Sequence, residues 1–387
     1  MEIGLDLWNP EQAEWWTELG CSWTKVPWGD LDNAAADRAG SVAHITAARD
    51  AGLRVIVDIR PSQEMIGALL LLQTTVPTND TDARALAERT ETLLPRLRKG
   101  AATCAALCKD LVADFEFWGE FDCPCTGVGA IWPNKEVHYA RYLGAVREGL
   151  KGVLPAARLW NGGYGVCFED KFMAELAEHA GHSFDVANWH DYNVTEYWPR
   201  EGGRSDGTPL YATPIADCIA HSTKLFDEMY ARNRVLLDTL GTGQVYASSE
   251  WGMVAVRQEW VDMYRKAFHE KELRHLPMWD PAESLAPGFQ LEGQGDVSAL
   301  GDEEAALFLD AWLAARERAG FEVVNYHYLR DPDHALAYEK AQSCGGDMKF
   351  WGYFCGLQFA DGTNKATFDV VKRWAQKAKE ARTDAEV

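Results

Sequence analysis

The chain has 387 residues, of which 47% are hydrophobic and 25% are charged, a composition typical of a globular protein with a large apolar core. Its formal net charge is −21, from 38 Lys and Arg against 59 Asp and Glu. Nucleic acids and anionic membranes are bound through clustered Lys and Arg, so this charge argues against both kinds of partner.

The N-terminus reads MEIGLDLW and shows neither the basic nor the apolar region of a signal peptide. The most apolar run, residues 66–72, is far too short to span a bilayer. The nine Cys are odd in number and scattered, which is typical of buried thiols in a reducing compartment. We therefore expect a cytoplasmic protein, with a trimmed export signal as the alternative.

Short β-rich runs alternate with helical runs along the whole chain. Strands that alternate with helices form parallel sheets, and eight strands with no linker between them predict one domain over residues 1–387, a (β/α)₈ TIM barrel. A doubly wound open sheet is the competitor, but the first strand lacks a Gly-rich phosphate loop after it. The predicted strands are residues 2–8, 21–28, 53–59, 111–118, 158–161, 184–190, 244–250 and 321–328.

Predicted helices follow these strands, the first opening at Asn9 and the others near residues 41–51, 82–109, 139–150, 170–179, 214–233, 303–319 and 365–381. Three stretches are too long for plain connections, namely residues 62–81, 192–213 and 269–301. Barrels carry their active sites on loops at the C-terminal face, so we expect long βα loops there.

Polar side chains gather where the predicted strands end. Glu120 follows the fourth strand, Glu250 ends the seventh, and His190 and Tyr192 lie at the end of the sixth. Strands on opposite sides of a narrow barrel bring two carboxylates near each other across its mouth. One protonated and one ionised carboxyl in that arrangement are the groups that hydrolyse glycosides.

These segments resemble the catalytic segments of clan A glycoside hydrolases, most closely those of the β-xylosidase and α-iduronidase family. Residues 115–121 (FEFWGEF) are similar to the F-E-x-W-N-E-P of that clan, residues 250–252 to its E-W-G, residues 190–192 to its H-x-Y, and residues 359–365 to its closing D-G-x-x-K. The resemblance implies a retaining reaction with Glu120 as acid/base and Glu250 as nucleophile. It also implies that Tyr192 hydrogen-bonds the nucleophile.

Two positions depart from the pattern of the clan. Gly119 stands where the clan has an Asn that contacts the 2-hydroxyl of the sugar, which implies another donor, a substrate modified at position 2, or weaker catalysis. The Arg usual near the second strand is absent, and Lys25 is the nearest basic residue there. Arg60, just past the third strand, is the alternative source of that charge.

Aromatic side chains near strand ends suit a sugar site, because sugars pack their C–H faces on flat rings. For Trp8, Trp28 and Trp251 we weigh this role equally against core packing, whereas Trp15, Trp16, Trp260, Trp312 and Trp374 fall on predicted helices and are expected to be structural. The predicted substrate-binding residues are Trp8, Lys25, Trp28, Arg60, Trp118, Gly119, Asn161, His190, Tyr192, Trp251, Asn325 and Tyr328.

The leading hypothesis is a retaining hydrolase of a β-linked glycoside or oligosaccharide that needs no cofactor. One alternative is a metal-dependent sugar isomerase or epimerase, which would use Glu120, His190, Asp191 and Glu250 as ligands. The other is a barrel that binds sugar with little or no turnover, which Gly119 favours. Cys123 and Cys125 lack a second pair or a nearby His to complete a zinc set, so we expect no metal there.

Overall fold

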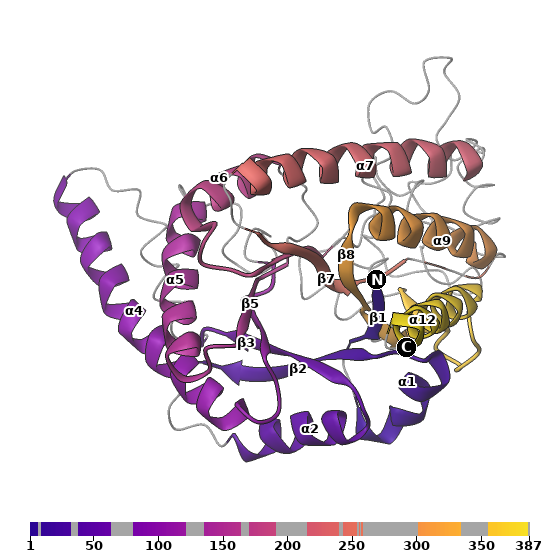
Figure 1. The fold of residues 1–387 in the computed structure, drawn as a ribbon, viewed down its shortest axis with the longest axis horizontal. Helices are drawn as coiled ribbons and strands as arrows, with labels where there is room; N and C mark the ends of the chain where they lie inside the picture. The colour runs from indigo at the N-terminus through magenta and orange to yellow at the C-terminus, as the bar shows by residue number, and fades with distance from the viewer. Residues whose placement is uncertain are drawn as a thin grey trace, which may run out of the picture. The chain divides into compact units, whose positions relative to one another are not determined.

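The computed structural model describes residues 1–6, 9–31, 38–62, 80–120, 135–163, 170–190, 215–239, 243–253, 255, 257, 301–333 and 355–385. Eight strands form a closed barrel in the order β1 to β8 (Figure 1), with parallel pairing throughout the ladder from β1 to β7. This confirms the predicted (β/α)₈ barrel. The strands are β1 (Glu2–Leu5), β2 (Trp23–Asp30), β3 (Arg54–Arg60), β4 (Asp114–Phe117), β5 (Arg158–Asn161), β6 (Val186–Asn188), β7 (Val245–Trp251) and β8 (Phe321–Tyr326).

The helices alternate with the strands as predicted. Glycines in the left-handed conformation end two of them, because Gly20 (φ 76°) follows α1 and Gly320 (φ 83°) follows α9. The described helices are the short 3₁₀ turn η1 (Pro10–Gln12), α1 (Ala13–Leu19), α2 (Ala39–Asp50), α4 (Asp80–Cys108), α5 (Lys135–Val153), α6 (Asp170–Ala180), α7 (Ile215–Thr239), α9 (Asp302–Ala319) and α12 (Ala366–Ala385).

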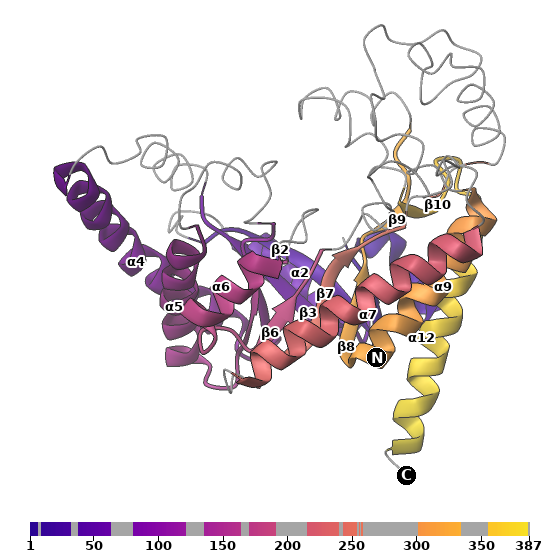
Figure 2. The ribbon, with the colours of Figure 1, turned by 90° about the horizontal axis from the view of Figure 1, so that it is seen from above.

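The chain divides into two compact units. The first, Met1–His190, Met229–Glu250 and Gly320–Asn325, contains nearly all of the barrel strands together with α1, α2, α4, α5 and α6. Helix α2 packs on β2 and β3 (Figure 1), and α4 lies beside α5 (Figure 2).

The interior of the barrel is layered, because side chains two residues apart along a strand point to the same face. The middle layer is apolar and consists of Trp23, Ile56, Trp160, Val186, Ala247 and Val323. Two residues further along five of these strands, the layer becomes polar, with Lys25, Asp58, Asn188, Ser249 and Asn325, all buried. The apolar layer seals the barrel, and the polar layer begins the C-terminal face where Glu120 and Glu250 lie.

The second unit contains α9 and α12, which lie side by side (Figure 2), and a pairing that the sequence did not predict. The predicted last strand, residues 321–328, ends at Tyr326, and Tyr328 begins a separate strand β9 (Tyr328–Arg330) that pairs with β10 (Gly356–Gln358). A buried ion pair, Lys365 Nζ to Asp331 Oδ2 at 2.8 Å, holds the chain after β10 to the end of β9.

Most of the three long predicted connections lies outside the described residues. This holds for residues 63–79 of the first connection, for the whole of the second (192–213) and for residues 269–300 of the third. Among the described residues, none of the helices combines the length and the apolarity that a bilayer crossing requires. Four cysteines in the described part of the chain, Cys21, Cys104, Cys108 and Cys355, are buried free thiols, as expected, whereas Cys123 and Cys125 are outside the described residues.

Candidate active site

The turn after β4 places Glu120 with an unusual backbone. Trp118 and Glu120 both have positive φ (58° and 56°), a conformation that costs a residue other than glycine about 1–3 kcal/mol. The turn is held on both sides, since Trp118 N donates to Ile59 O of β3 (2.9 Å) and Glu120 N donates to Gly163 O after β5 (2.8 Å). Strain of this kind is characteristic of functional positions, and here it coincides with the predicted acid/base.

Glu120 and Glu250 come together as the sequence predicts. One carboxylate oxygen of each, with a ring nitrogen of His190, all lie within 4.8 Å of one another. Both carboxylates are partly accessible, with side-chain exposures of 20% for Glu120 and 14% for Glu250. The pair is therefore close enough to act on one bond and open enough to meet a substrate.

His190 lies at the centre of this cluster. Its Nε2 is 3.0 Å from Glu116 Oε1 and 2.9 Å from Ser249 Oγ, and its Nδ1 is 3.3 Å from Glu120 Oε1. Burial by itself lowers the pKa of His190, but the charge of Glu250 and hydrogen bonds to Glu116 and Glu120 raise the pKa to about 10. At neutral pH, His190 is thus a buried imidazolium facing three carboxyl groups.

Lys25 is the second buried cation of the site. Its Nζ donates to Glu250 Oε2 at 2.7 Å and lies 3.6 Å from Asp6 Oδ2 and 3.7 Å from Glu116 Oε2. Burial lowers the pKa of Lys25, and the negative charges of Asp6, Glu116 and Glu250 outweigh this and raise it well above the ordinary value. Lys25, predicted as the replacement for an absent arginine, contacts the predicted nucleophile directly.

Arg60, the alternative predicted source of that charge, is paired elsewhere. Its side chain is largely exposed and binds Asp58 Oδ2 at 2.7 Å. The charge of Asp58 raises the pKa of Arg60, with smaller contributions from Glu250 and Glu116. Arg60 therefore adds positive potential to the site, whereas the direct ion pair with Glu250 belongs to Lys25.

Two glycines make room for the imidazole. A Cβ on Gly163 would lie 1.9 Å from His190 Cδ2, and a Cβ on Gly119 would lie 3.1 Å from His190 Cε1. The ring of His190 thus packs against both glycines. Gly119 stands where the clan has an Asn, and here the ring of His190 lies in the space that a side chain at this position would enter.

Asn161 and Asn325, predicted to bind hydroxyls, are fully buried and bonded to neighbouring strands. Asn161 Oδ1 accepts from Asn188 N (2.8 Å) and its Nδ2 donates to Asn188 O (3.2 Å), while Asn325 Nδ2 donates to Ser249 O (3.0 Å). These bonds hold β5 to β6 and β8 to β7. Both residues therefore help to shape the barrel mouth, and direct contact with substrate hydroxyls stays a prediction.

The described tryptophans near strand ends are core residues. Trp28, Trp118 and Trp251 are buried, and Trp251 stacks on Trp312 with ring centroids 6.0 Å apart and has the Arg316 guanidinium 3.9 Å from its own ring centroid. Burial of Trp28 and Trp251 favours core packing over sugar contact, and their role at the site stays a prediction. Tyr328 lies on β9 and is half-buried, while Trp8 and Tyr192 are outside the described residues.

Sequence reasoning missed the buried charges beneath the two carboxylates, Glu116, Asp6 and Asp58. The signal was present, because each is an ionisable residue directly beside apolar residues in or just after a predicted strand, and a buried charge requires a partner. Burial raises the pKa of Glu116, but the charge of Lys25 and the hydrogen bond from His190 outweigh this and lower it to about 2. Glu116 is therefore a permanent anion below the reacting pair.

The cluster of Glu120, His190 and Glu250 also has the donor atoms of a metal site, as the isomerase alternative requires. A histidine ligates a metal only through an unprotonated ring nitrogen. The carboxylates around His190 raise its pKa to about 10, so both ring nitrogens carry protons at neutral pH. A divalent cation bound here would have to displace a proton from His190, and the isomerase alternative stays a prediction.

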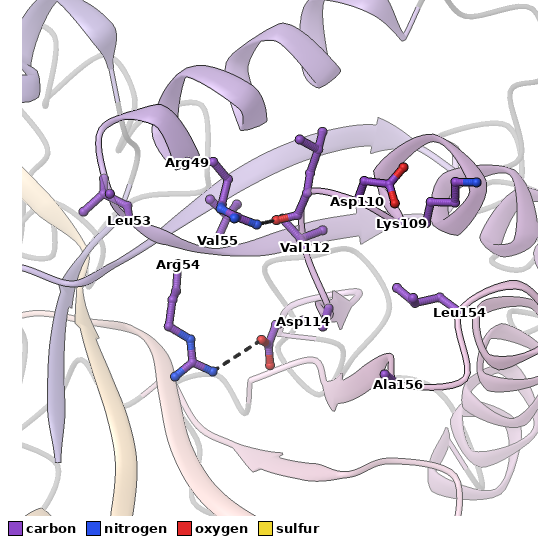
Figure 3. A pocket seen from close by; sticks show the side chains of 13 residues that line it. Arg49, Leu53, Arg54, Val55, Lys109, Asp110, Val112, Asp114, Leu154 and Ala156 are labelled. Carbon is purple, nitrogen blue, oxygen red and sulfur yellow. Dashed lines mark hydrogen bonds and ion pairs between the residues drawn. The ribbon is translucent and has the colours of Figure 1, made fainter. Parts of the chain in front are cut away.

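A cavity of about 580 Å³ lies at the opposite, N-terminal end of the strands (Figure 3). It is lined where α2 and α4 end and β3 and β4 begin, and Arg54 faces Asp114 across it at 3.9 Å. The N-terminal face of a barrel is generally associated with stability. This cavity contributes nothing to the cluster around Glu120 and Glu250.

No family model and no curated protein matches the sequence. Solved structures do match. An exo-β-1,4-mannosidase from Opitutaceae bacterium strain TAV5 is similar at 14% identity and TM-score 0.56, over 98% of this chain and 60% of that one. A GH5-4 broad specificity endoglucanase from Clostridium longisporum is similar at 11% identity and TM-score 0.55, over 96% of this chain and 86% of that one. A glucosidase from Croceicoccus marinus is similar at 12% identity and TM-score 0.53, over 97% of this chain and 67% of that one.

The chain has the barrel fold of these glycosidases. At such identities the similarity establishes the fold, and the chemistry must be argued from the residues at the strand ends. The closer resemblance to the β-xylosidase and α-iduronidase family stays a prediction.

Proposed function

We propose that this chain is a retaining glycoside hydrolase that acts on a β-linked glycoside or oligosaccharide. The observation that carries the proposal is the pair Glu120 and Glu250 at the ends of β4 and β7, with carboxylate oxygens within 4.8 Å of each other. Retaining enzymes hold their two carboxyl groups about 5–5.5 Å apart, whereas inverting enzymes need about 6.5–9.5 Å to admit a water.

The unequal surroundings of the two carboxyls support their separate roles. Glu250 accepts a hydrogen bond from Lys25, whose positive charge keeps a carboxylate ionised as a nucleophile must be. Glu120 lies on the other side of His190, with its Oε1 3.3 Å from His190 Nδ1. The resemblance to clan A assigns the role of acid to Glu120.

In the first step, Glu120 gives its proton to the glycosidic oxygen as the bond from that oxygen to the anomeric carbon breaks, and Glu250 attacks that carbon. In the second step, Glu120 takes a proton from water, and the water oxygen displaces Glu250 from the anomeric carbon. Two inversions return the original configuration. Lys25 and His190 stabilise Glu250 as it leaves with its negative charge restored.

The test is turnover of a panel of aryl β-glycosides. Glu250→Gln should reduce kcat by at least about 10⁴-fold, because an amide cannot form the glycosyl ester. Glu120→Ala should lose the acid/base but release activated aryl leaving groups when azide is added, giving a β-glycosyl azide. Glu322→Gln, a change of the same kind at the start of β8, serves as the control and should stay active.

Two outcomes would contradict the proposal. Full activity in Glu250→Gln would show that Glu250 is not the nucleophile. A first product with α configuration, measured by proton NMR, would show that the enzyme inverts the anomeric carbon. Tight binding of sugar with no hydrolysis of any member of the panel would favour the alternative of a sugar-binding barrel.

A further inference from the structure

We propose that Glu116 is a positioning residue of the active site, which orients His190 and Lys25 and through these two cations holds the Glu120 and Glu250 carboxylates. The inference rests on the proposed function of the site. It assigns a role to a carboxylate that the reaction itself does not use.

Glu116 divides its two oxygens between the two cations. Its side chain is fully buried on β4, and the strand register places Glu116 beside Asp58 of the polar layer. Oε1 accepts from His190 Nε2 at 3.0 Å and from Gly163 N at 3.3 Å, whereas Oε2 lies 3.7 Å from Lys25 Nζ. One carboxylate therefore contacts both cations of the site without being accessible to a substrate.

The far side of each cation contacts the reacting pair. His190 Nδ1 is 3.3 Å from Glu120 Oε1 and 3.9 Å from Glu250 Oε2, and Lys25 Nζ is 2.7 Å from the same Glu250 oxygen. Both catalytic carboxylates are thus one side chain away from Glu116. Displacement of either cation changes where the acid and the nucleophile lie.

Charge, and not only hydrogen bonding, is needed at this position. A neutral amide would still accept from His190 and from Gly163, but it would leave two buried cations facing fewer anions. The lowered pKa of Glu116 (about 2) and the raised pKa of His190 (about 10) are consistent with a fully ionised pair. Glu116→Gln therefore separates the charge from the shape of the side chain.

The ionisable groups that face His190 come from several strands. Glu116 and Glu120 come from β4 and the turn after it, and Glu250 comes from β7, which also contributes the hydroxyl of Ser249. Lys25 on β2 is the nearby like charge, held to Glu116 and Glu250. Removal of the Glu116 charge leaves the other carboxyls in place, so His190 should lose its proton at a lower pH than in the wild type.

The experiment compares wild type with Glu116→Gln by kinetics and by NMR. We expect kcat to fall about 10²-fold, the effect of misplacing catalytic groups by about 1 Å, while KM changes by less than about threefold because Glu116 does not touch the substrate. As the pH rises, kcat of the variant should begin to fall at a lower pH than kcat of the wild type. Histidine labelled with ¹⁵N, with His190→Gln to assign the signal, should show a titration at least about one pH unit lower than in wild type.

Asp114→Asn is the matched control. Asp114 is a second buried carboxylate of β4, two residues before Glu116, and it is paired with Arg158 at 2.7 Å at the other end of the barrel. Loss of this carboxylate should leave the His190 titration and the shape of the pH profile unchanged, whatever it does to the melting temperature. Comparison of the two variants distinguishes positioning from loss of a buried charge in general.

An active wild type whose kcat, pH profile and His190 titration are all unchanged by Glu116→Gln would overturn the inference. A wild type that hydrolyses no glycoside is instead a failure of the proposed function. In that case the ¹⁵N titration still decides, because an unshifted His190 refutes control by Glu116 and a shifted one supports it.

Discussion

At the scale of single residues, the proposed chemistry depends on charges that water does not screen. His190 and Lys25 are buried cations, and each contacts at least two carboxylates across the barrel mouth. Interactions of this kind weaken little with added salt but change sharply when one partner loses its charge. The protonation of His190 should therefore be visible in the stability of the fold.

The first prediction concerns how the free energy of unfolding depends on pH through the proton of His190. The pKa of His190 is raised from 6.5 to about 10, so the folded state binds this proton more tightly than the unfolded state. Its stabilisation is full below pH 6.5 and is lost as the pH rises through 10. We expect the free energy of unfolding to decrease over this window, by up to about 1.4 kcal/mol per pH unit.

Urea unfolding between pH 6.5 and 9.5 measures this slope, and His190→Gln is the comparison. The variant should be less stable at pH 6.5, and its curve should approach that of the wild type at high pH because the remaining ionisable groups are shared. Parallel curves for the two proteins would contradict the assignment of the raised pKa to His190.

The residue scale also shows how far the sequence predicts the site. Glu120, His190 and Glu250 lie at or just after predicted strand ends, which meet at one face of a barrel, and the structure brings the three side chains together, whereas their roles stay a prediction. Glu116 was passed over because its neighbours fix it inside a strand, where the sequence does not show which charge it pairs with. That partner, Lys25, lies 91 positions earlier in the chain, and only closure of the barrel brings the two together.

At the scale of elements, strands and helices were predictable because their apolar periods differ. The boundaries were less so: β8 ends at Tyr326, and β9 pairs with β10, which lies in a segment with no strand prediction. The strained turn of Trp118 and Glu120 was not predictable either, since neither residue favours positive φ. Its conformation is held by bonds to β3 and to Gly163, which follows β5, and the local sequence contains neither partner.

Helix packing gives a prediction at this scale. Gly149 and Gly152 both lie on α5, and a Cβ on Gly149 would lie 2.2 Å from Arg98 O of α4, whereas one on Gly152 would meet nothing within 4 Å. Gly149→Ala should destabilise the fold by about 1–3 kcal/mol through overpacking, despite the better helix propensity of Ala. Gly152→Ala should stabilise it by up to about 1 kcal/mol.

Equilibrium unfolding of the two variants, made by the same substitution on one helix, isolates the close approach of α5 to α4. If Gly149→Ala were as stable as Gly152→Ala, the contact with the α4 backbone would not be a constraint on the fold. Activity should be unaffected in Gly152→Ala, so this variant also controls for effects of expression and purification.

At the scale of the whole molecule, the net charge of −21 bears on which glycosides approach the site. Like charge slows the encounter of an anionic substrate, an effect that salt screens within a Debye length. The cations near the proposed nucleophile do not reverse this, because Lys25 is paired with Glu250 and Arg60 with Asp58. The proposed enzyme should therefore prefer neutral sugars.

The last prediction tests this with a matched pair of substrates. An aryl β-glycoside that the enzyme hydrolyses is compared with the uronide that differs only by a carboxylate at C6. At low ionic strength, where the Debye length is about 30 Å, we expect kcat/KM for the uronide to be at least about tenfold lower. Raising the ionic strength to about 0.15 M should narrow the ratio, because the Debye length falls to about 8 Å while the neutral substrate responds little. A uronide hydrolysed faster than its neutral partner, with salt slowing it, would instead mean that Lys25 or Arg60 exchanges its protein carboxylate for that of the sugar.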